Sequence, residues 1–154
     1  MKKIIFVCTG NTCRSPMAEA LAHKSFSDNN LDIKVMSRGI LVTFPSPASE
    51  YVVVVVEKDY PEIIRHTATI FNEDEVDNET LVLTMTMKHK EYLHMKYPGI
   101  KENVVTLKEY LDDIGDIIDP YGNSKNVYIK CAENISLLIN KLVFKIKDME
   151  ELSW

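Results

Sequence analysis

The feature that most constrains the fold is a short segment near the N-terminus that joins an apolar run to a helical pattern. Residues 3–7 are expected to form a buried strand, and residues 16–26 a helix. Between them lies a cysteine, five residues, and then arginine and serine, in the order Cys8-Thr9-Gly10-Asn11-Thr12-Cys13-Arg14-Ser15. In a loop of this kind the backbone N–H groups converge on an anion, and the helix N-terminus adds its positive end. The sequence therefore predicts a phosphate-binding loop.

The cysteine at the start of this loop is a candidate nucleophile. The field of the loop favours the Cys8 thiolate, which is the form of cysteine that attacks phosphorus. Arg14 is expected at the same site, where its planar guanidinium fits two phosphate oxygens. The alternative is a buried cysteine that merely ends a strand. The context favours the nucleophile, because Pro16 suits a first helical turn and Ser15 is a candidate N-cap.

The rest of the chain alternates between strand and helix patterns. Further strands are expected at 33–39, 81–85 and 103–107, and further helices at 87–97 and 124–147. Alternating elements with short links predict an α/β fold, a three-layer sandwich with a central parallel four-stranded sheet and helices on both faces. No linker interrupts this pattern, so residues 1–154 are expected to form a single domain.

One segment, residues 48–58, fits two structures. Its five consecutive valines favour a strand, because β-branched side chains are stiff in helices. Pro47-Ala48-Ser49-Glu50, however, looks like the start of a helix. We predict a helix, and its poor intrinsic propensity means that packing must hold it.

Composition excludes several classes of protein. The 154 residues carry a net charge of −5 with scattered Lys and Arg, so we expect no nucleic-acid partner. No apolar run reaches membrane-spanning length, and the N-terminal apolar run is too short for a signal peptide. Three cysteines without metal-ligand spacing suit a reducing cytoplasm. Nothing calls for a metal or cofactor, a monomer is expected, and His89 and His94 are expected on a solvated helix face.

Two segments resemble the low-molecular-weight protein tyrosine phosphatase family. The loop from Cys8 matches its C-x5-R-S-P signature, and Asp119-Pro120-Tyr121 matches the segment that bears its general acid. The resemblance covers most of the chain and is weakest at residues 40–75. It implies a cysteine-dependent protein phosphatase that forms a cysteinyl-phosphate on phosphorylated protein substrates. A thiol-dependent arsenate reductase is a distant alternative, but it needs two further downstream cysteines, and residues 82–96 contain none.

The resemblance also assigns roles. Cys8 would attack phosphorus, Arg14 would bind the phosphoryl oxygens and Asp119 would protonate the leaving group. The phosphate-binding set would comprise Thr9, Gly10, Asn11, Thr12, Cys13, Arg14 and Ser15. Asn11 would hold the shape of the loop or only supply a turn, and Ser15 would donate a hydrogen bond to the thiolate. Cys13 would either trap oxidised Cys8 as a disulfide or simply pack inside the loop.

Substrate preference is expected to depend on the pocket walls. Thr12 resembles the branch of the family that acts on phosphoarginine, because its hydroxyl offers a polar contact that a guanidinium can use. Phosphotyrosine remains the alternative. Tyr121 would form one wall, and Leu41 or Phe44 the opposite one. Arg38 departs from the small residue usual in the family; it would be either a rim contact for acidic substrates or a surface side chain, and we expect the surface.

Overall fold

A parallel sheet forms the centre of the computed structural model, which describes residues 1–153. The sheet has four strands in the order β2-β1-β3-β4, and every neighbouring pair is parallel. The strands are β1 (Lys3–Cys8), β2 (Lys34–Gly39), β3 (Thr80–Thr84) and β4 (Val104–Thr106). The predicted parallel four-stranded α/β fold is confirmed.

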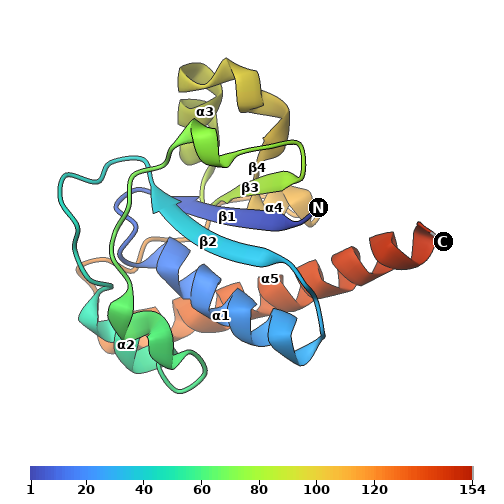
Figure 1. Ribbon diagram of the computed structural model, residues 1–154. Coiled ribbons are helices and arrows are strands. Elements are labelled where there is room, and N and C mark those ends of the chain that lie inside the picture. Colours follow the sequence, from blue (N-terminus) through green and yellow to red (C-terminus); the bar gives the residue numbers. More distant parts are fainter. Residues whose placement is uncertain (154) are drawn as a thin grey trace.

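Helices cover both faces of this sheet. Figure 1 shows α1, α2 and α5 below the sheet and α3 above it. The helices are α1 (Arg14–Asp28), α2 (Glu50–Val56), α3 (Met87–Lys96), α4 (Leu107–Tyr110) and α5 (Lys125–Leu152), with 3₁₀ helices at Pro61–Arg65, Glu73–Glu75 and Pro98–Asn103. Among residues 1–153, none of these helices is both long enough and apolar enough to cross a membrane.

The central strand β1 supplies side chains to two separate cores. Ile4 and Phe6 belong to the larger core, which α1, α2 and α5 complete. Ile5 and Val7 belong to the smaller core on the other face, where Leu93 of α3 packs. Because successive side chains of a strand point to opposite faces, a central strand covered on both sides must be apolar throughout. This explains the continuous apolar run that precedes Cys8.

The valine-rich segment is a helix, as predicted, in spite of its β-branched side chains. Val52 and Val56 are four residues apart and fully buried, whereas Tyr51 and Val54 are partly exposed. The Tyr51 ring also contacts Tyr128 of α5, with ring centroids 5.3 Å apart. Packing of one helix face therefore outweighs the low intrinsic propensity of valine.

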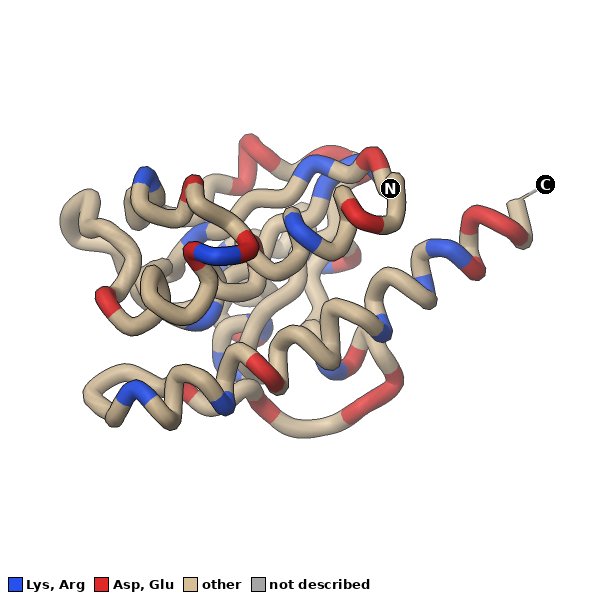
Figure 2. The backbone as a smooth tube through the Cα atoms, turned by 90° about the horizontal axis from the view of Figure 1, so that it is seen from below, with Lys and Arg blue, Asp and Glu red and all other residues tan. Residues whose placement is uncertain are grey.

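Charged residues of both signs are distributed over the whole chain. Figure 2 shows Lys and Arg interleaved with Asp and Glu along the helices and loops. The longest helix, α5, carries its charges outside a buried stripe formed by Cys131, Ile135, Leu138 and Leu142. A helix was predicted here from the sequence, although α5 extends five residues beyond the predicted end at 147.

Candidate active site

The loop between β1 and α1 lies at the carboxyl edge of the sheet, beside the point where strand order reverses. From β1 the chain goes to β2 on one side and later returns through β3 on the other side. In open α/β sheets, such a switch point leaves a crevice at the carboxyl ends of the strands, where ligands bind. The segment before α5 reaches the same edge, because the Ile117 N–H donates to the Met85 carbonyl at 3.0 Å.

Four backbone carbonyl groups of the loop accept hydrogen bonds from residues outside the loop. A trans peptide carries its C=O and the following N–H on opposite sides, and residues 1–153 contain no cis peptide. The N–H groups of Thr9, Gly10, Thr12 and Cys13 therefore point the other way, into the loop, as an anion site requires. The four outer bonds run from Ile40 N–H to Cys8 O (3.1 Å), Leu41 N–H to Thr9 O (2.9 Å), His66 Nε2 to Asn11 O (2.7 Å) and Ser49 N–H to Thr12 O (2.9 Å).

Asn11 occupies the tightest point of the loop. Its φ is +57°, in the left-handed region that asparagine tolerates better than most residues. Its buried amide donates to Ser15 Oγ at 2.8 Å and to Ser37 Oγ at 3.0 Å. Its side-chain oxygen accepts from the Thr69 N–H at 3.0 Å. These bonds connect the loop to α1, to β2 and to the segment after α2.

Ser15 lies directly beneath the candidate nucleophile. Its hydroxyl oxygen is 2.9 Å from Cys8 Sγ and 3.4 Å from the Arg38 carbonyl. Asn11 donates to the same oxygen, so the single Ser15 proton goes either to Cys8 or to the Arg38 carbonyl, and the shorter contact favours Cys8. The expectation that Ser15 is the helix N-cap is wrong: α1 already begins at Arg14, and Cys13 is its N-cap. Ser15 therefore lies inside the first turn, where its hydroxyl contacts Cys8.

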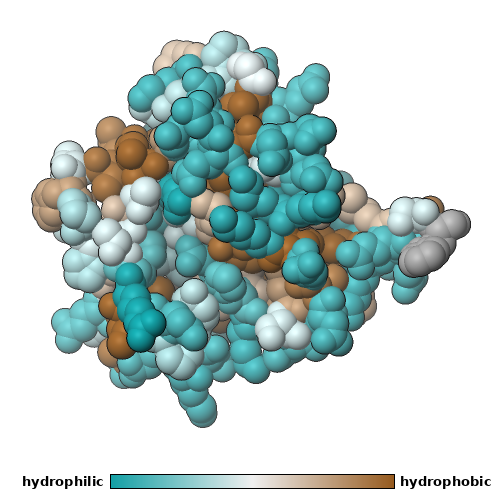
Figure 3. Space-filling model, in the orientation of Figure 1, coloured by the Kyte–Doolittle hydropathy of each residue, from teal (hydrophilic) through white to brown (hydrophobic). Residues whose placement is uncertain are grey.

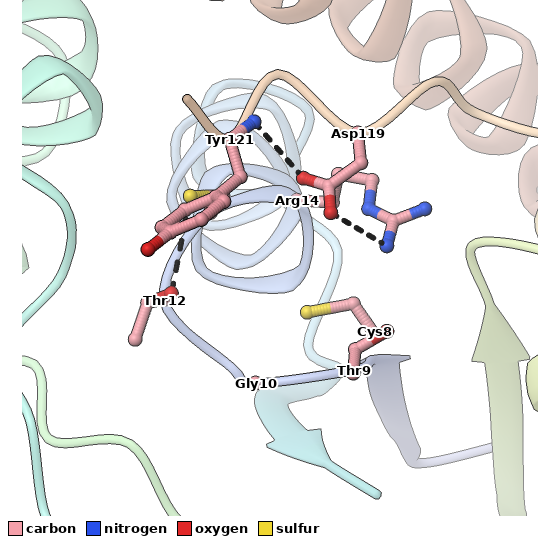
Figure 4. A pocket seen from close by; sticks show the side chains of 8 residues that line it. Cys8, Thr9, Gly10, Thr12, Arg14, Asp119 and Tyr121 are labelled. Carbon is pink, nitrogen blue, oxygen red and sulfur yellow. Dashed lines mark hydrogen bonds and ion pairs between the residues drawn. The ribbon is translucent and has the colours of Figure 1, made fainter. Parts of the chain in front are cut away.

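Arg14 and Asp119 meet although they come from opposite ends of the chain. Arg14 is buried, its Nη1 donates to the Ile117 carbonyl at 3.0 Å, and its Nη2 lies 3.5 Å from Asp119 Oδ2. The second carboxylate oxygen of Asp119 accepts from the Tyr121 N–H at 3.1 Å. About half of the Asp119 side chain is exposed. Figure 4 shows its carboxylate beside the guanidinium, facing Cys8 across the pocket.

These groups line a pocket of about 210 Å³. Leu41 and Phe44, expected as a wall of the pocket, are not among its lining residues; they lie on the loop after β2 and are 64% and 68% exposed. Figure 3 shows an exposed apolar region over that loop. Asn11 and Ser15 are buried beneath the pocket. Its lining residues are Cys8, Thr9, Gly10, Thr12, Cys13, Arg14, Asp119 and Tyr121.

Cys13 lines the pocket, but its thiol contacts a side chain of the protein interior. Its Sγ lies 3.5 Å from the Tyr128 hydroxyl, which in turn accepts from Ser49 Oγ at 3.3 Å. Burial raises the pKa of the Cys13 thiol above its ordinary value. Cys8, Cys13 and Cys131 are all free thiols in this structure. Among residues 1–153, no three His, Cys, Asp or Glu side chains cluster as ligands for a metal ion.

His89 is not on a solvated face, and this expectation is corrected. Its side chain is 4% exposed, and its Nε2 lies 2.9 Å from Thr9 Oγ1. The ring turns inward because it shares a face of α3 with Leu93, which is fully buried. The spacing of four residues between His89 and Leu93 was the signal that could have revealed this. His94 lies on the same helix and contacts the Val104 carbonyl at 3.0 Å.

Arg38 also differs from the expectation of a surface side chain. Its guanidinium makes a two-pronged contact with the Glu75 carboxylate at 2.8 and 2.7 Å, and only 18% of the side chain is exposed. Hydrogen bonds from Arg38 lower the pKa of Glu75. The pair connects the end of β2 to the 3₁₀ helix at Glu73–Glu75. His66 and Thr69 contact Asn11 of the loop, and they too lie in segments that no sequence motif identified.

Comparison with known proteins finds relatives that are named as protein phosphatases. A model of the family described as low molecular weight phosphotyrosine protein phosphatase matches residues 3–152. The chain is 36% identical over 147 residues to a Bacillus subtilis (strain 168) protein named protein-arginine-phosphatase, covering 94% of this chain and 96% of the relative. It is 38% identical over 141 residues to low molecular weight protein-tyrosine-phosphatase PtpB of Staphylococcus aureus, covering 91% and 96%.

A solved structure extends the comparison to the fold. It is the YwlE arginine phosphatase, studied as a cysteine-to-serine mutant with a phosphorylated active-site serine. The two folds superpose with a TM-score of 0.87 at 35% identity, over 94% of this chain and 95% of that one.

Proposed function

Because the chain belongs to the low molecular weight phosphotyrosine protein phosphatase family, we propose that it hydrolyses phosphorylated side chains through a phosphocysteine on Cys8. One observation carries this proposal. Cys8, Arg14 and Asp119 line a single pocket whose floor consists of inward-facing N–H groups. A nucleophile, an anion-binding cradle and an acid in one site are the components that phosphoryl transfer needs.

The reaction would proceed in two displacements. The Cys8 thiolate forms an S–P bond while the bond from phosphorus to the leaving atom breaks, and Asp119 donates a proton to that atom. A water molecule then attacks phosphorus, Asp119 takes its proton, and the S–P bond breaks to release inorganic phosphate. Arg14 and the loop N–H groups bind the equatorial oxygens and the charge that builds on them in each transition state.

The relative with a phosphorylated active-site serine supports the phosphoenzyme step. In that mutant of an arginine phosphatase, serine replaces cysteine and carries phosphate. A hydroxyl in the place of the thiol can accept the phosphoryl group, which is the behaviour expected of a residue that attacks phosphorus in line.

The first prediction tests the nucleophile. Cys8→Ser should lower turnover to below a few per cent of the wild-type rate, because a serine hydroxyl is a far weaker nucleophile than a thiolate. Binding of inorganic phosphate should persist, because the loop N–H groups and Arg14 remain. Steady-state hydrolysis and phosphate titration measure the two effects. Cys131→Ser is the matched control, since Cys131 lies on α5 outside the pocket. Substantial turnover by Cys8→Ser would rule out the covalent route.

For the substrate, we propose phosphoarginine in proteins, with phosphotyrosine as the alternative. Thr12 lines the pocket, so its hydroxyl is placed where it can contact a leaving group. A guanidinium can donate to that hydroxyl, whereas the ring of a phosphotyrosine cannot. The named arginine phosphatase among the relatives supports this choice. Tyr121 suits either substrate, because both an aromatic ring and a guanidinium stack on its face.

The second prediction concerns this preference. Thr12→Ile should lower kcat/KM for phosphoarginine peptides relative to phosphotyrosine peptides by about 5- to 150-fold, the effect of losing one polar partner. Both substrates are measured on the same preparation, so that a general loss of activity cancels in the ratio. An unchanged ratio would favour phosphotyrosine and leave the rest of the mechanism intact.

We also propose a monomeric enzyme that acts on phosphoproteins in the cytoplasm. The three free thiols support a reducing compartment, since Cys8 must stay reduced to react. The dispersed charge supports substrates other than nucleic acid.

A further inference from the structure

A buried histidine contacts the phosphate loop in a way that the two displacements do not use. His89 Nε2 lies 2.9 Å from the Thr9 hydroxyl oxygen. Thr9 follows the nucleophile in the chain and lines the pocket, and Figure 4 shows it at the Cys8 end. His89 belongs to α3, the helix that follows β3 in the chain. The contact therefore joins the pocket lining to a helix outside the loop.

The two ring nitrogens of His89 have different surroundings. Nδ1 is buried and has no hydrogen-bond partner. Among residues 1–153, every other buried side-chain nitrogen or oxygen has one. Buried donors without an acceptor are rarer in proteins than acceptors without a donor. The single proton of a neutral ring therefore belongs on Nε2, where it is donated to Thr9 Oγ1.

Several groups around the ring keep it neutral. Burial is the largest cause, followed by the positive charge of Arg14, and together they lower the pKa of His89 to about 4. Asp116 and Asp119 act in the opposite direction but are outweighed. His89 is also the third residue of α3, near the positive end of the helix dipole. A second proton would leave a buried cationic N–H at Nδ1 without an acceptor.

The direction of this bond decides what the Thr9 hydroxyl can do. A threonine hydroxyl has one proton to donate. Since Thr9 Oγ1 accepts from His89 and has no other hydrogen-bond partner in the described part of the chain, its own proton is free to be donated into the pocket. We propose that His89 is a positioning residue that orients the Thr9 hydroxyl as a hydrogen-bond donor to an oxygen of the phosphoryl group.

This inference rests on the proposed function and extends its phosphate cradle. The N–H groups of the loop and Arg14 would be joined by one side-chain hydroxyl whose direction is set from α3. A neutral donor aimed at a dianion forms a charge-assisted bond, which is stronger than a bond between neutral groups. Because the donor is fixed before the anion arrives, no reorientation is needed when it binds.

Two Thr9 variants test the hydroxyl. Thr9→Val keeps the shape and removes the donor, so it should weaken inhibition by inorganic phosphate and lower kcat/KM by about 10- to 100-fold. Thr9→Ser keeps the donor and should retain most of both. The pH dependence of Cys8 alkylation by iodoacetamide should not change in either variant. Unchanged phosphate inhibition in Thr9→Val would overturn the proposal, as would a shift in alkylation alone, which would mean that the hydroxyl serves the thiolate.

His89 variants test whether the ring acts through Thr9. His89→Leu removes the donor and should weaken phosphate inhibition, whereas His89→Gln can place an amide N–H where Nε2 was and should restore part of it. When Thr9 is already valine, His89→Leu should cause no further loss of kcat/KM. His94→Gln, on the same helix, is the matched control and should resemble the wild type. Additive losses, or equal effects of glutamine and leucine at position 89, would reduce His89 to a packing role and overturn the proposal.

The tautomer can be observed without any turnover. In a ¹H–¹⁵N spectrum of the folded protein tuned to the histidine rings, the His89 proton should be coupled to Nε2. A proton on Nδ1 would overturn the proposal, because Thr9 would then donate to the ring instead of into the pocket. These readouts separate two failures. Absence of phosphatase activity in the wild type refutes the proposed function, whereas the tautomer and phosphate binding decide the role of His89.

Discussion

At the scale of single residues, Asp119 is the group whose surroundings most directly suggest its chemistry. One carboxylate oxygen lies 3.5 Å from the Arg14 guanidinium, and the other accepts the Tyr121 N–H. Half-exposed at the rim of the pocket, the carboxylate can exchange protons with solvent and still reach a bound leaving group. Pro120, the next residue, keeps the backbone of Asp119 out of the helical region and so favours a loop.

Asp119→Asn tests this assignment. Turnover should fall by about 10²- to 10⁴-fold for substrates with poor leaving groups, because the amide cannot deliver a proton. Activated aryl phosphates should lose much less, because their leaving groups depart without a proton. Rates on both kinds of substrate measure the difference. Asp116→Asn is a control, since Asp116 accepts the Met87 N–H outside the pocket lining. A similar loss on both substrates would contradict a role in proton transfer.

At the scale of elements, α2 shows packing overcoming propensity. Its five valines are individually poor helix formers, and only the pair that faces α1 and α5 is fully buried. The helix therefore depends on its neighbours rather than on its own sequence. Because α2 follows Ser49, whose N–H holds the Thr12 carbonyl at 2.9 Å, its stability bears on the phosphate loop as well.

A matched pair of substitutions separates the two contributions. Val54→Ala, at a position 45% exposed, should raise the free energy of unfolding by about 0.5 kcal/mol, because alanine is the better helix former. Val52→Ala, at a fully buried position, should lower it by about 1–3 kcal/mol through lost burial and a cavity. Urea unfolding of both variants measures the changes. Equal effects at the two positions would mean that packing does not discriminate between the helix faces.

Elements with a strong periodic pattern could be predicted from the sequence, and so could the short β4, which lies inside the strand expected at 103–107, but the shortest helices could not. The strand at residues 3–7 and the helix at 124–147 lie within one to five residues of β1 and α5, because long buried runs and stripes leave a clear pattern. The four-residue α4 and the 3₁₀ helices were not predicted. They are too short for periodicity and depend on local caps, such as Thr106 Oγ1 accepting from the Glu109 N–H.

At the scale of the whole molecule, the pocket is supported by groups that no local pattern encodes. The loop motif pointed to Cys8 and Arg14 because both lie in one continuous segment. His66 and His89 reach that segment from distant parts of the chain, and only the folded arrangement brings them there. A solvated face was predicted for His89 from its charged neighbours, whereas its burial follows from tertiary packing.

The buried His89 should also make the stability of the whole fold depend on pH. The unfolded ring takes up a proton near its ordinary pKa of 6.5, but the folded ring does so only near pKa 4. The unfolded state therefore binds more protons between these values, and stability falls as pH falls. From pH 7 to pH 5 the wild type should lose about 2 kcal/mol more than His89→Gln. Urea unfolding of both proteins at both pH values measures this. Parallel pH dependences would contradict the neutral, buried ring.

The contact between Arg14 and the Ile117 carbonyl makes the proposed active site depend on two distant parts of the chain. The two residues are 103 positions apart, so their meeting closes a loop that contains most of the sequence. During synthesis the proposed nucleophile Cys8 and its loop leave the ribosome long before the proposed acid Asp119 does. In refolding, contacts between residues so far apart in sequence contribute to slow folding, because the entropy of closing the loop is lost before the contact can stabilise the chain. Recovery of activity is therefore expected to be a late event, and cleavage between α4 and Asp119 would place the proposed nucleophile and the proposed acid on different fragments.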